Sequence, residues 1–433
     1  MQSLAETERI ERDTNLTIVE FAEHRTIAFF GIFGVQNLGN ECTLQAILSN
    51  AAEQVPDAKL VGVSYDPEDT CQRHKITCIP VEATPRVRSI GTNNKGHVRR
   101  LLRLIFRRGP SEIMDLRRAA RALRGTQLVL MTGTGMLTDY STSAMGYPYH
   151  VFKWTLGARL AGCKVRFVGV GVGPIYSPLS RWFIKSALWL ADYRSYRDHF
   201  SKERIRKYGF KSDIDPVFPD LAFSLPPQIF PKRAARIREK PVVGIGIMQH
   251  ADVHIGTPQE QRAAQCSYFD KMCEFISWLL QNQYEIRILQ GDSRWDPDAR
   301  KELRTRLEQR GIHYEKAPIT DEGCNSVDQL LRQLAECDFI VSPRFHNLVL
   351  GLMLGIPVIS ISYDPKNDCL LEQFGLSNYR QTMDKLDVQK LTEQFADLVA
   401  HSSEVKPTFR SVAEENRELL AEQYKLLFEE RRT

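Results

Sequence analysis

Three basic side chains in the second half of the chain, Arg344, His346 and Lys366, have the types and spacing of an anion-binding site. A guanidinium and an ammonium bind phosphate or carboxylate through charge-assisted hydrogen bonds, and an imidazole exchanges protons near neutral pH. Arg344 and His346 follow the short β-branched run Phe339–Val341, and Lys366 follows the apolar run Val358–Tyr363. These residues therefore suit binding of a small anion together with proton transfer.

The residues between these basic groups predict a strand, a helix and a second strand. Ser342 is a suitable helix N-cap, and Pro343 is a suitable first helical residue. Asn347–Leu354 supplies helix formers, and Gly355 ends the helix. In a parallel sheet the basic groups then lie at the carboxyl ends of two strands, where open α/β sheets bind ligands. The helix N-terminus adds its dipole and free N–H groups to the site.

Three turns that contain glycines follow predicted strands in the first half, at Gly31–Glu41, Gly133–Asp139 and Gly169–Pro174. Glycine lets the backbone approach a ligand closely, although tight loop geometry alone explains such turns equally well. The first turn lacks the glycine spacing of a dinucleotide site. From these turns we predict a set of residues that face a sugar: Gly34, Asn37, Gly39, Asn40, Glu41, Asp139 and Gly173.

Two further polar stretches are candidates for ligand contact. The stretch Tyr193–Asp198 alternates as a strand and leaves Arg197 at its end, where a guanidinium binds a carboxylate or phosphate with two hydrogen bonds. A surface ion pair is the alternative for this arginine. The stretch Gln249–His254 includes His250 and invites a metal interpretation, but no third strong ligand is close in the sequence. We predict no metal there, and either a solvated loop or ligand contact from His250.

Length and composition are those of an ordinary globular protein with two domains. The chain has 433 residues, of which 42% are hydrophobic and 26% charged. Its net charge of +5 is too small to indicate nucleic acid as a partner. The nine cysteines are scattered without metal-ligand spacing, which favours a reducing compartment. No secretory signal and no apolar run of membrane-spanning length is visible, so we expect a cytoplasmic protein.

Alternating strand and helix patterns predict an α/β protein with two Rossmann-like, doubly wound domains that face each other across a cleft. A stretch rich in proline separates the two sets of alternating elements, and an amphipathic helix is expected at Ser411–Arg432. The predicted organisation is an N-terminal extension at 1–25, a first domain at 26–223, a linker at 224–240, a second domain at 241–400 and a C-terminal helix at 401–433.

The segment Lys95–Arg124 is strongly basic, with leucines interleaved among its arginines. Such a pattern fits contact with an anionic membrane surface. It fits equally a pair of solvated helices with one buried face. Both interpretations remain open from the sequence.

Taken together, these motifs resemble the polysaccharide pyruvyltransferase family, and the resemblance covers about Thr26–Phe374. The motifs that carry it are Asn37-x-Gly39-Asn40-Glu41, Gly169–Pro174, Arg197-Asp198 with Ser201, Asp220–Phe223, Arg344-Phe345-His346, and Gly355-Ile356-Pro357 with Tyr363–Lys366. The resemblance implies a GT-B-like architecture. It also implies transfer of pyruvate from phosphoenolpyruvate to two hydroxyls of a sugar, which forms a cyclic ketal.

The resemblance also implies roles for single residues. The anion-binding arginine, histidine and lysine of the family would be Arg197, His346 and Lys366, with His346 acting as acid and base or only as a phosphate ligand. The expected donor-binding residues are Arg344, Ser342, Asp364 and His250. The first domain would bind the acceptor, a sugar of a polysaccharide or a lipid-linked oligosaccharide, so that peripheral contact with the inner membrane surface is an option. No metal and no redox cofactor is expected.

Two other functions fit the same residues. One is a GT-B glycosyltransferase that uses a nucleotide sugar. Arg344 and Lys366 would then bind the diphosphate of that nucleotide sugar. The other is a non-catalytic subunit that binds a sugar or a lipid carrier in a polymer assembly complex. The choice of donor separates the first alternative from pyruvyl transfer, and an effect of phosphoenolpyruvate on thermal stability tests the second.

Overall fold

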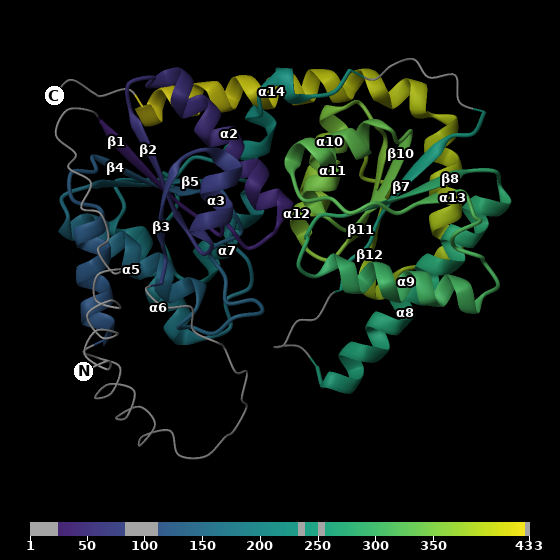
Figure 1. Ribbon diagram of the computed structural model, residues 1–433, viewed down its shortest axis with the longest axis horizontal. Coiled ribbons are helices and arrows are strands. Elements are labelled where there is room, and N and C mark those ends of the chain that lie inside the picture. The colour runs from purple at the N-terminus through teal and green to yellow at the C-terminus, as the bar shows by residue number, and fades with distance from the viewer. Residues whose placement is uncertain (1–24, 83–110, 233–238, 250–255, 429–433) are drawn as a thin grey trace, which may run out of the picture.

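The computed structural model describes residues 25–82, 111–232, 239–249 and 256–428. Its two halves lie side by side, and the long helix α14 crosses both of them (Figure 1). Each half is built on a six-stranded sheet, and the strand orders are β3-β2-β1-β4-β5-β6 and β12-β11-β10-β7-β8-β9. Every strand pairing in both sheets is parallel. Both orders are that of a doubly wound Rossmann sheet, which confirms the predicted fold class.

The first sheet follows from short apolar strands that are covered on both faces. Every residue of β1 (Thr26–Phe30) and β4 (Leu128–Thr132) is buried, as expected for a parallel sheet with helices on both sides. The other elements of this half are β2 (Lys59–Ser64), β3 (Thr77–Pro80), β5 (Lys164–Val170), β6 (Tyr193–Tyr196), α2 (Leu38–Gln54), α3 (Pro67–His74), α5 (Tyr147–Leu160), α6 (Pro178–Leu190) and α7 (His199–Lys207).

The second half repeats this construction after the short helices η1 (Leu221–Ser224) and η2 (Pro227–Ile229). Its strands are β7 (Val242–Gly246), β8 (Glu285–Leu289), β9 (Ile319–Thr320), β10 (Phe339–Ser342), β11 (Val358–Ser362) and β12 (Arg380–Thr382). Its helices are α8 (Pro258–Gln281), α9 (Asp296–Gln309), α10 (Val327–Ala335), α11 (Phe345–Met353), α12 (Pro365–Gln373), η3 (Met383–Lys385), α13 (Val388–Ala400) and α14 (Ser402–Phe428).

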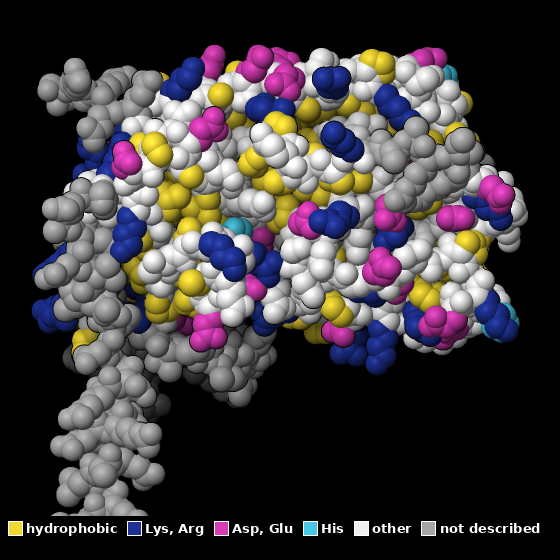
Figure 2. Space-filling model, turned by 45° about the horizontal axis from the view of Figure 1, so that its top comes forward, with side chains coloured by type: hydrophobic (Ala, Val, Ile, Leu, Met, Phe, Trp, Pro, Cys, Tyr) yellow, Lys and Arg dark blue, Asp and Glu magenta, His cyan; other side chains and the backbone are white. Residues whose placement is uncertain are grey.

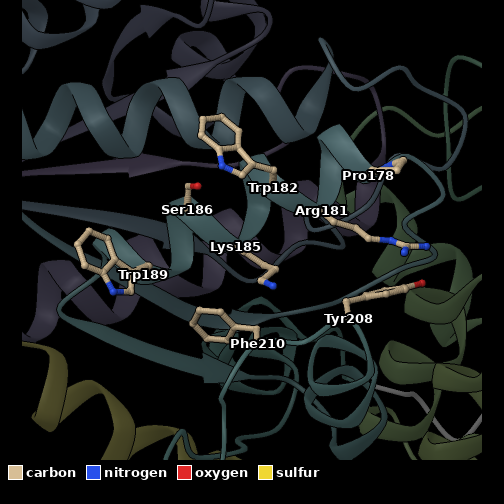
Figure 3. Close-up of a pocket in the computed structure, with 8 residues that line it drawn as sticks. All are labelled: Pro178, Arg181, Trp182, Lys185, Ser186, Trp189, Tyr208 and Phe210. Atoms are coloured by element: carbon tan, nitrogen blue, oxygen red, sulfur yellow. The ribbon is translucent and has the colours of Figure 1, made fainter.

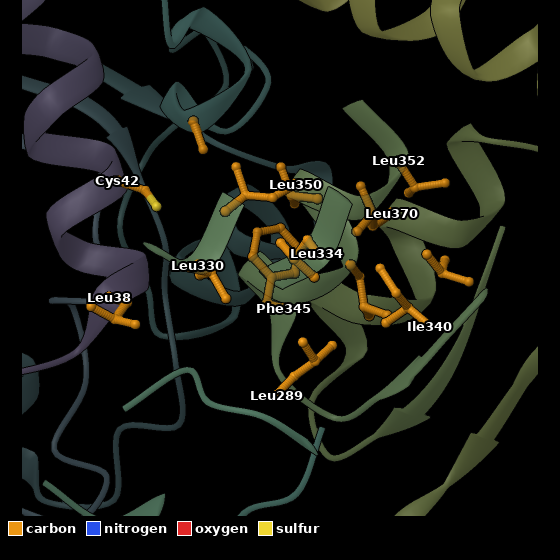
Figure 4. Packing of buried hydrophobic residues seen from close by; sticks show 14 of the residues in the cluster. Leu38, Cys42, Leu289, Leu330, Leu334, Ile340, Phe345, Leu350, Leu352 and Leu370 are labelled. Atoms are coloured by element: carbon orange, nitrogen blue, oxygen red, sulfur yellow. The ribbon is translucent and has the colours of Figure 1, made fainter. Parts of the chain in front are cut away.

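The two halves are packed against each other through α2. Leu38 and Cys42 lie on the side of α2 that faces Leu330 and Leu350 of the second half (Figure 4). All four belong to one continuous hydrophobic core that spans both halves. The backbone N–H of Leu38 also donates to the carbonyl of Gly291, at 3.0 Å. The N-terminus of α2 is therefore held directly by the second half.

Helix α14 returns from the second half to the first. The hydroxyls of Tyr424 and Ser224 are 2.8 Å apart, and the Gln423 amide donates to Ser195 Oγ at 2.7 Å. These contacts tie the C-terminal helix to η1 and to the end of β6. The predicted domain boundaries are compatible with the two sheets, but they stay a prediction.

Two predicted element boundaries are wrong. The helix after β10 begins at Phe345 with Arg344 as its N-cap, not at Pro343 after Ser342. Ser342 instead continues the strand, and its hydroxyl accepts the N–H of Arg344 at 3.1 Å. The C-terminal helix begins at Ser402 rather than Ser411, because Pro407 is accommodated inside it.

The surface of the described residues mixes charges of both signs. Figure 2 shows Lys and Arg side chains interspersed with Asp and Glu on the face that it presents. Of the basic segment 95–124, residues 95–110 lie outside the described residues. Among the helices that the structure describes, none combines the length and apolar character needed to cross a membrane.

Candidate active site

Helices α11 and α12 begin side by side, because β10 and β11 are neighbouring parallel strands. Their register pairs Ser342 with Ser360 at the carboxyl edge of the sheet. His346 and Lys366 are the second residues of α11 and α12. Among the described residues, no side chain caps the N-terminus of α11, so its first-turn N–H groups are suited to an anion. The structure thus brings both predicted residues to the same edge.

His346 is held between the two halves of the molecule. Its Nε2 lies 3.6 Å from Oδ1 of Asp220, which stands just before η1, and its side chain is 16% exposed. On its other side the imidazole contacts Gly39 of α2 so closely that a Cβ at position 39 would lie 2.0 Å from Nδ1. The ring position therefore depends on a glycine and a carboxylate that both come from the first half.

Asp220 joins His346 to Arg197. Its Oδ2 lies 3.7 Å from NH1 of Arg197, and its Oδ1 accepts the N–H of Ala222 at 3.0 Å. Burial disfavours the ionised form of Asp220, but His346 and Arg197 outweigh burial, so the pKa of Asp220 lies below its ordinary value. Asp220 is absent from the set of predicted site residues. The only sequence signal for it was its position in the motif Asp220–Phe223.

Arg197 follows the end of β6, as predicted, and is almost fully buried. Its Nε lies 3.3 Å from Oδ2 of Asp198, and its guanidinium lies against Gly171, where a Cβ would be 2.6 Å from Cζ. Burial acts against its charge, but Asp198 and Asp220 outweigh this and raise the pKa of Arg197. Its Cζ lies 5.3 Å from the centre of the Phe345 ring, within the range of a cation–π contact.

Lys366 reaches the same aromatic ring. Its Nζ lies 5.9 Å from the centre of Phe345 and donates a 2.8 Å hydrogen bond to the hydroxyl of Tyr363. Among the described residues no carboxylate lies within 4.0 Å of this ammonium group. Phe345 therefore gathers Arg197, His346 and Lys366 around one ring. In the sequence, Phe345 is recognisable only as part of the motif Arg344-Phe345-His346 and has no predicted role, because the residue type does not show which distant cations reach its ring.

The predicted donor residues differ in their surroundings. Arg344 forms an ion pair with the buried Asp296 of α9, so its charge is already balanced. Burial opposes that charge, but Asp296 and Asp292 outweigh it and raise the pKa of Arg344. Ser342 is buried beneath Arg344, and His250 lies outside the described residues.

Asp364 caps α12 by accepting the N–H of Lys366 at 3.0 Å. Burial acts to raise its pKa, but the charge and the N–H of Lys366 outweigh burial and hold the pKa of Asp364 below its usual value. Its carboxylate therefore sets the start of the helix that carries Lys366.

The predicted acceptor residues near α2 have partners within the chain. Asn37 caps α2, and its amide donates to Asp292 of the second half at 3.2 Å. Asn40 donates to the carbonyl of Ile32 at 2.8 Å. Glu41 is fully buried, where it lies 2.8 Å from Nε2 of His74 and accepts the N–H of Gly34 at 3.1 Å. Gly39 alone of this group lies directly against His346.

The other two predicted acceptor residues join neighbouring loops. Asp139 is buried and accepts the N–H groups of Tyr176 and Ser177, at 2.8 and 2.9 Å. Gly173 packs on Thr138, where a Cβ would be 2.6 Å from Oγ1. The acceptor-binding role of the whole set stays a prediction. In the described part of the chain, no group of three or more His, Cys, Asp or Glu side chains is arranged to hold a metal ion.

Replacing Asp296 by Asn is expected to lower the free energy of unfolding by about 3–5 kcal/mol, because it removes the ion-pair partner of the buried Arg344 guanidinium and leaves only Asp292, which is outside ion-pair distance. The measurement is urea unfolding followed by circular dichroism. Asp298→Asn is the matched control, since Asp298 is exposed on the first turn of the same helix, and it should change stability by less than about 0.5 kcal/mol. Equal stability of the two variants would show that this ion pair does not contribute to the free energy of unfolding as expected.

The chain resembles known proteins in its sequence and in its fold. A family model described as "Polysaccharide pyruvyl transferase" matches residues 37–365. No protein of curated function matches the chain by sequence.

Several solved structures share the fold. A UDP-GlcNAc 2-epimerase from Neisseria meningitidis bound to UDP-GlcNAc is 11% identical, with a TM-score of 0.55 over 93% of this chain and 100% of that one. Anabaena Alr3699/HepE, in complex with UDP and glucose, is 13% identical, with a TM-score of 0.58 over 92% and 99%. A glycosyltransferase from Rickettsia africae is 11% identical, with a TM-score of 0.58 over 94% and 98%. At these identities the likeness establishes the two-domain GT-B fold alone.

Proposed function

Because this chain belongs to the polysaccharide pyruvyl transferase family, we propose that it transfers pyruvate from phosphoenolpyruvate to two hydroxyls of a sugar and forms a cyclic ketal. The observation that supports this most is the convergence of Arg197, His346 and Lys366 on the Phe345 ring. Two cations and a proton-transfer group then lie beside the uncapped N-terminus of α11.

In this proposal the donor binds to the second half. Phosphoenolpyruvate concentrates a phosphate and a carboxylate in a small volume. The Lys366 ammonium and the N–H groups of α11 bind one anionic group, and the Arg197 guanidinium binds the other. Lys366 contributes most to affinity, because its ammonium has no carboxylate partner among the described residues.

The chemistry is a sequence of proton transfers and additions. Protonated His346 delivers a proton to the methylene carbon of the enol, and one sugar hydroxyl adds to C2 as that carbon gains positive character. Phosphate then leaves with its bonding electrons, and the second hydroxyl adds to C2 to close the ketal. Of the two hydroxyl protons, one replaces the proton given by His346 and the other leaves with phosphate. As the methylene carbon becomes a methyl group and C2 gains its second bond to oxygen, the oxidation-state changes of the two carbons cancel, so the reaction is redox-neutral and needs no redox cofactor.

Asp220 acts in this scheme as a positioning residue. Its carboxylate lies 3.6 Å from Nε2 of His346 and 3.7 Å from NH1 of Arg197. It therefore orients the imidazole and the guanidinium toward one ligand. Because Asp220 and Gly39 both belong to the first half, which we propose binds the acceptor, the site is complete only when the two halves are in contact.

The proposal is tested by supplying the protein with phosphoenolpyruvate, with UDP-glucose and with a bacterial exopolysaccharide as acceptor. The expected result is release of inorganic phosphate from phosphoenolpyruvate, together with an acceptor mass gain of one pyruvate less one water. Consumption of UDP-glucose with phosphoenolpyruvate left intact would instead establish the glycosyltransferase alternative. Absence of turnover with both donors, and no thermal stabilisation by phosphoenolpyruvate, would favour a binding subunit.

Lys366→Gln is expected to raise the KM for phosphoenolpyruvate, with a fall in kcat/KM of about 10- to 100-fold. That range corresponds to the loss of one charge-assisted hydrogen bond of about 1.5–3 kcal/mol. Initial rates over a range of donor concentrations measure the effect. Lys390→Gln is the matched control, because Lys390 also lies in a first helical turn that is capped by an aspartate. An unchanged KM in Lys366→Gln would remove this lysine from the donor site.

A further inference from the structure

A cavity of about 480 Å³ lies along helix α6, and His346 is not among the residues that line it. We call it the α6 groove. Its walls include Arg181, Trp182, Lys185 and Trp189 of α6, with Tyr208 and Phe210 facing them across the cavity (Figure 3). The side chain of Lys185 extends from α6 toward the two facing aromatic rings (Figure 3). None of the residues that line the cavity is acidic.

The tryptophans of the α6 groove lie outside the buried core, although one side of the Trp182 ring packs on Phe152 and Phe183, with ring centres 5.3 and 5.2 Å away. The opposite face of α6 already buries Phe183, Ile184 and Leu188. Trp182 and Trp189 are seven residues apart, so they lie on one face of the helix, and they are 55% and 78% exposed. Two large aromatic rings held open beside a concavity are typical of a binding surface.

The cations of the groove are available to a ligand. Within the described chain, Lys185 makes no hydrogen bond and no ion pair, and a Cβ at Gly209, between the lining residues Tyr208 and Phe210, would lie 3.4 Å from its Nζ. Arg181 lies over the ring of Tyr208, with Cζ 5.0 Å from the ring centre, and uses its Nε for the carbonyl of Ile175. The groove thus offers flat aromatic faces and positive charge without a competing carboxylate.

The groove is connected to the candidate active site by one short helix. Helix α7 has Asp198, the partner of Arg197, as its N-cap and Tyr208 as its C-cap. Its nine residues correspond to about 13 Å. The hydroxyl of Tyr208 also accepts the N–H of Ile175 at 3.0 Å, just after the glycine-containing loop that surrounds Arg197. The length of α7 is that of a chain of a few sugar units.

We propose that the α6 groove binds an acidic segment of the polysaccharide acceptor, a few sugar units away from the unit that receives pyruvate. This rests on the proposed function, which supplies the polysaccharide. Pyranose rings present apolar C–H faces that stack on Trp182 and Trp189. A uronate or ketal carboxylate on the same segment pairs with Lys185 and Arg181. A concave groove suits a glycan strand better than a flat bilayer surface.

The test is direct binding to the full chain without donor, measured by calorimetry with tetragalacturonate as the acidic glycan and maltotetraose as the neutral one. The expected result is binding of tetragalacturonate that is weakened about tenfold by Trp189→Ala and by Lys185→Gln, with maltotetraose binding more weakly. Trp189 is chosen because its side chain is exposed, so its removal leaves the buried core intact. Trp295→Ala is the matched control, an exposed tryptophan of the second half, and should bind as wild type does.

His346→Gln separates this inference from the proposed function, because it should lose transfer and keep tetragalacturonate binding. The inference is overturned if wild-type protein does not bind tetragalacturonate. It is overturned equally if Trp189→Ala and Lys185→Gln bind it as tightly as wild type. Binding to phosphatidylglycerol vesicles that these two variants abolish, without binding of tetragalacturonate, would assign the groove to a membrane surface instead.

Discussion

His346→Gln is expected to lower kcat for pyruvyl transfer by about 10²- to 10⁴-fold. Glutamine keeps a polar side chain, but it neither gives nor takes a proton near neutral pH. The fold should survive, since Asp220 keeps its partners Arg197 and Ala222. The measurement is phosphate release at saturating phosphoenolpyruvate, with thermal unfolding run in parallel.

Measuring kcat and KM separately shows whether the imidazole of His346 is an acid–base catalyst or a phosphate ligand. Loss of acid–base catalysis lowers kcat and leaves the KM for phosphoenolpyruvate nearly unchanged. Loss of a phosphate ligand raises KM and leaves kcat close to wild type. His313→Gln is the control, because His313 is exposed in a loop of the second half. Near-normal kcat and KM in His346→Gln would exclude the residue from the mechanism.

The fold class follows from the sequence because parallel strands buried on both faces leave a strong apolar signal. β1 and β11 consist of buried residues throughout, and runs of that kind are visible without a structure. The edge strands β9 and β12 leave no such signal, since they have two and three residues and β12 reads Arg380-Gln381-Thr382. Edge strands of that length are defined by their neighbours rather than by their own composition.

In the site, too, local sequence patterns predict some features, whereas contacts between residues far apart in the sequence are not predicted. The position of His346 and Lys366 at one sheet edge follows from local strand and helix patterns, because neighbouring parallel strands share that edge. The partners of these residues do not follow from local patterns. Asp220 meets His346 only because η1 packs against α11. Asp296 neutralises Arg344 only because the first residue of α9 lies beside the N-cap of α11.

The predicted acceptor set illustrates why polar residues in turns are ambiguous. Glu41 and Asp139 have the types that suit contact with sugar hydroxyls, yet both are buried and bind groups of their own half. A turn needs partners for its free N–H groups, and carboxylates in turns meet that need whether or not a ligand is present. Sequence spacing alone does not separate the two uses.

Gly39→Ala is expected to lower kcat/KM for transfer by about 100-fold, even though alanine normally stabilises a helix relative to glycine. The added methyl would lie 2.0 Å from Nδ1 of His346, so either the ring or α2 has to move. The start of α2 is fixed by the Asn37 cap and by the hydrogen bond from Leu38 to Gly291. The imidazole is therefore the group that shifts, and it moves out of its alignment with Asp220.

Gly135→Ala is the matched control, because the nearest atom that a Cβ at that position would meet, among the described residues outside its chain neighbours, is NH2 of Arg197 at an ordinary 4.0 Å. Transfer rates and thermal unfolding of both glycine variants are compared with wild type. Gly135→Ala should keep activity within a few-fold. A fall in activity of the same size in both variants would point to a general disturbance of the sheet edge rather than to the imidazole.

A double-variant cycle decides whether Gly39 acts through His346. If the methyl disturbs catalysis only by displacing the imidazole, Gly39→Ala should cost little more in the His346→Gln background, where the flexible amide moves aside. The two losses would then be far from additive, and the residual rate of the double variant would equal that of His346→Gln. Fully additive losses would instead mean that position 39 contributes separately, through the acceptor side of the site, and that the close approach of α2 to α11 serves packing alone.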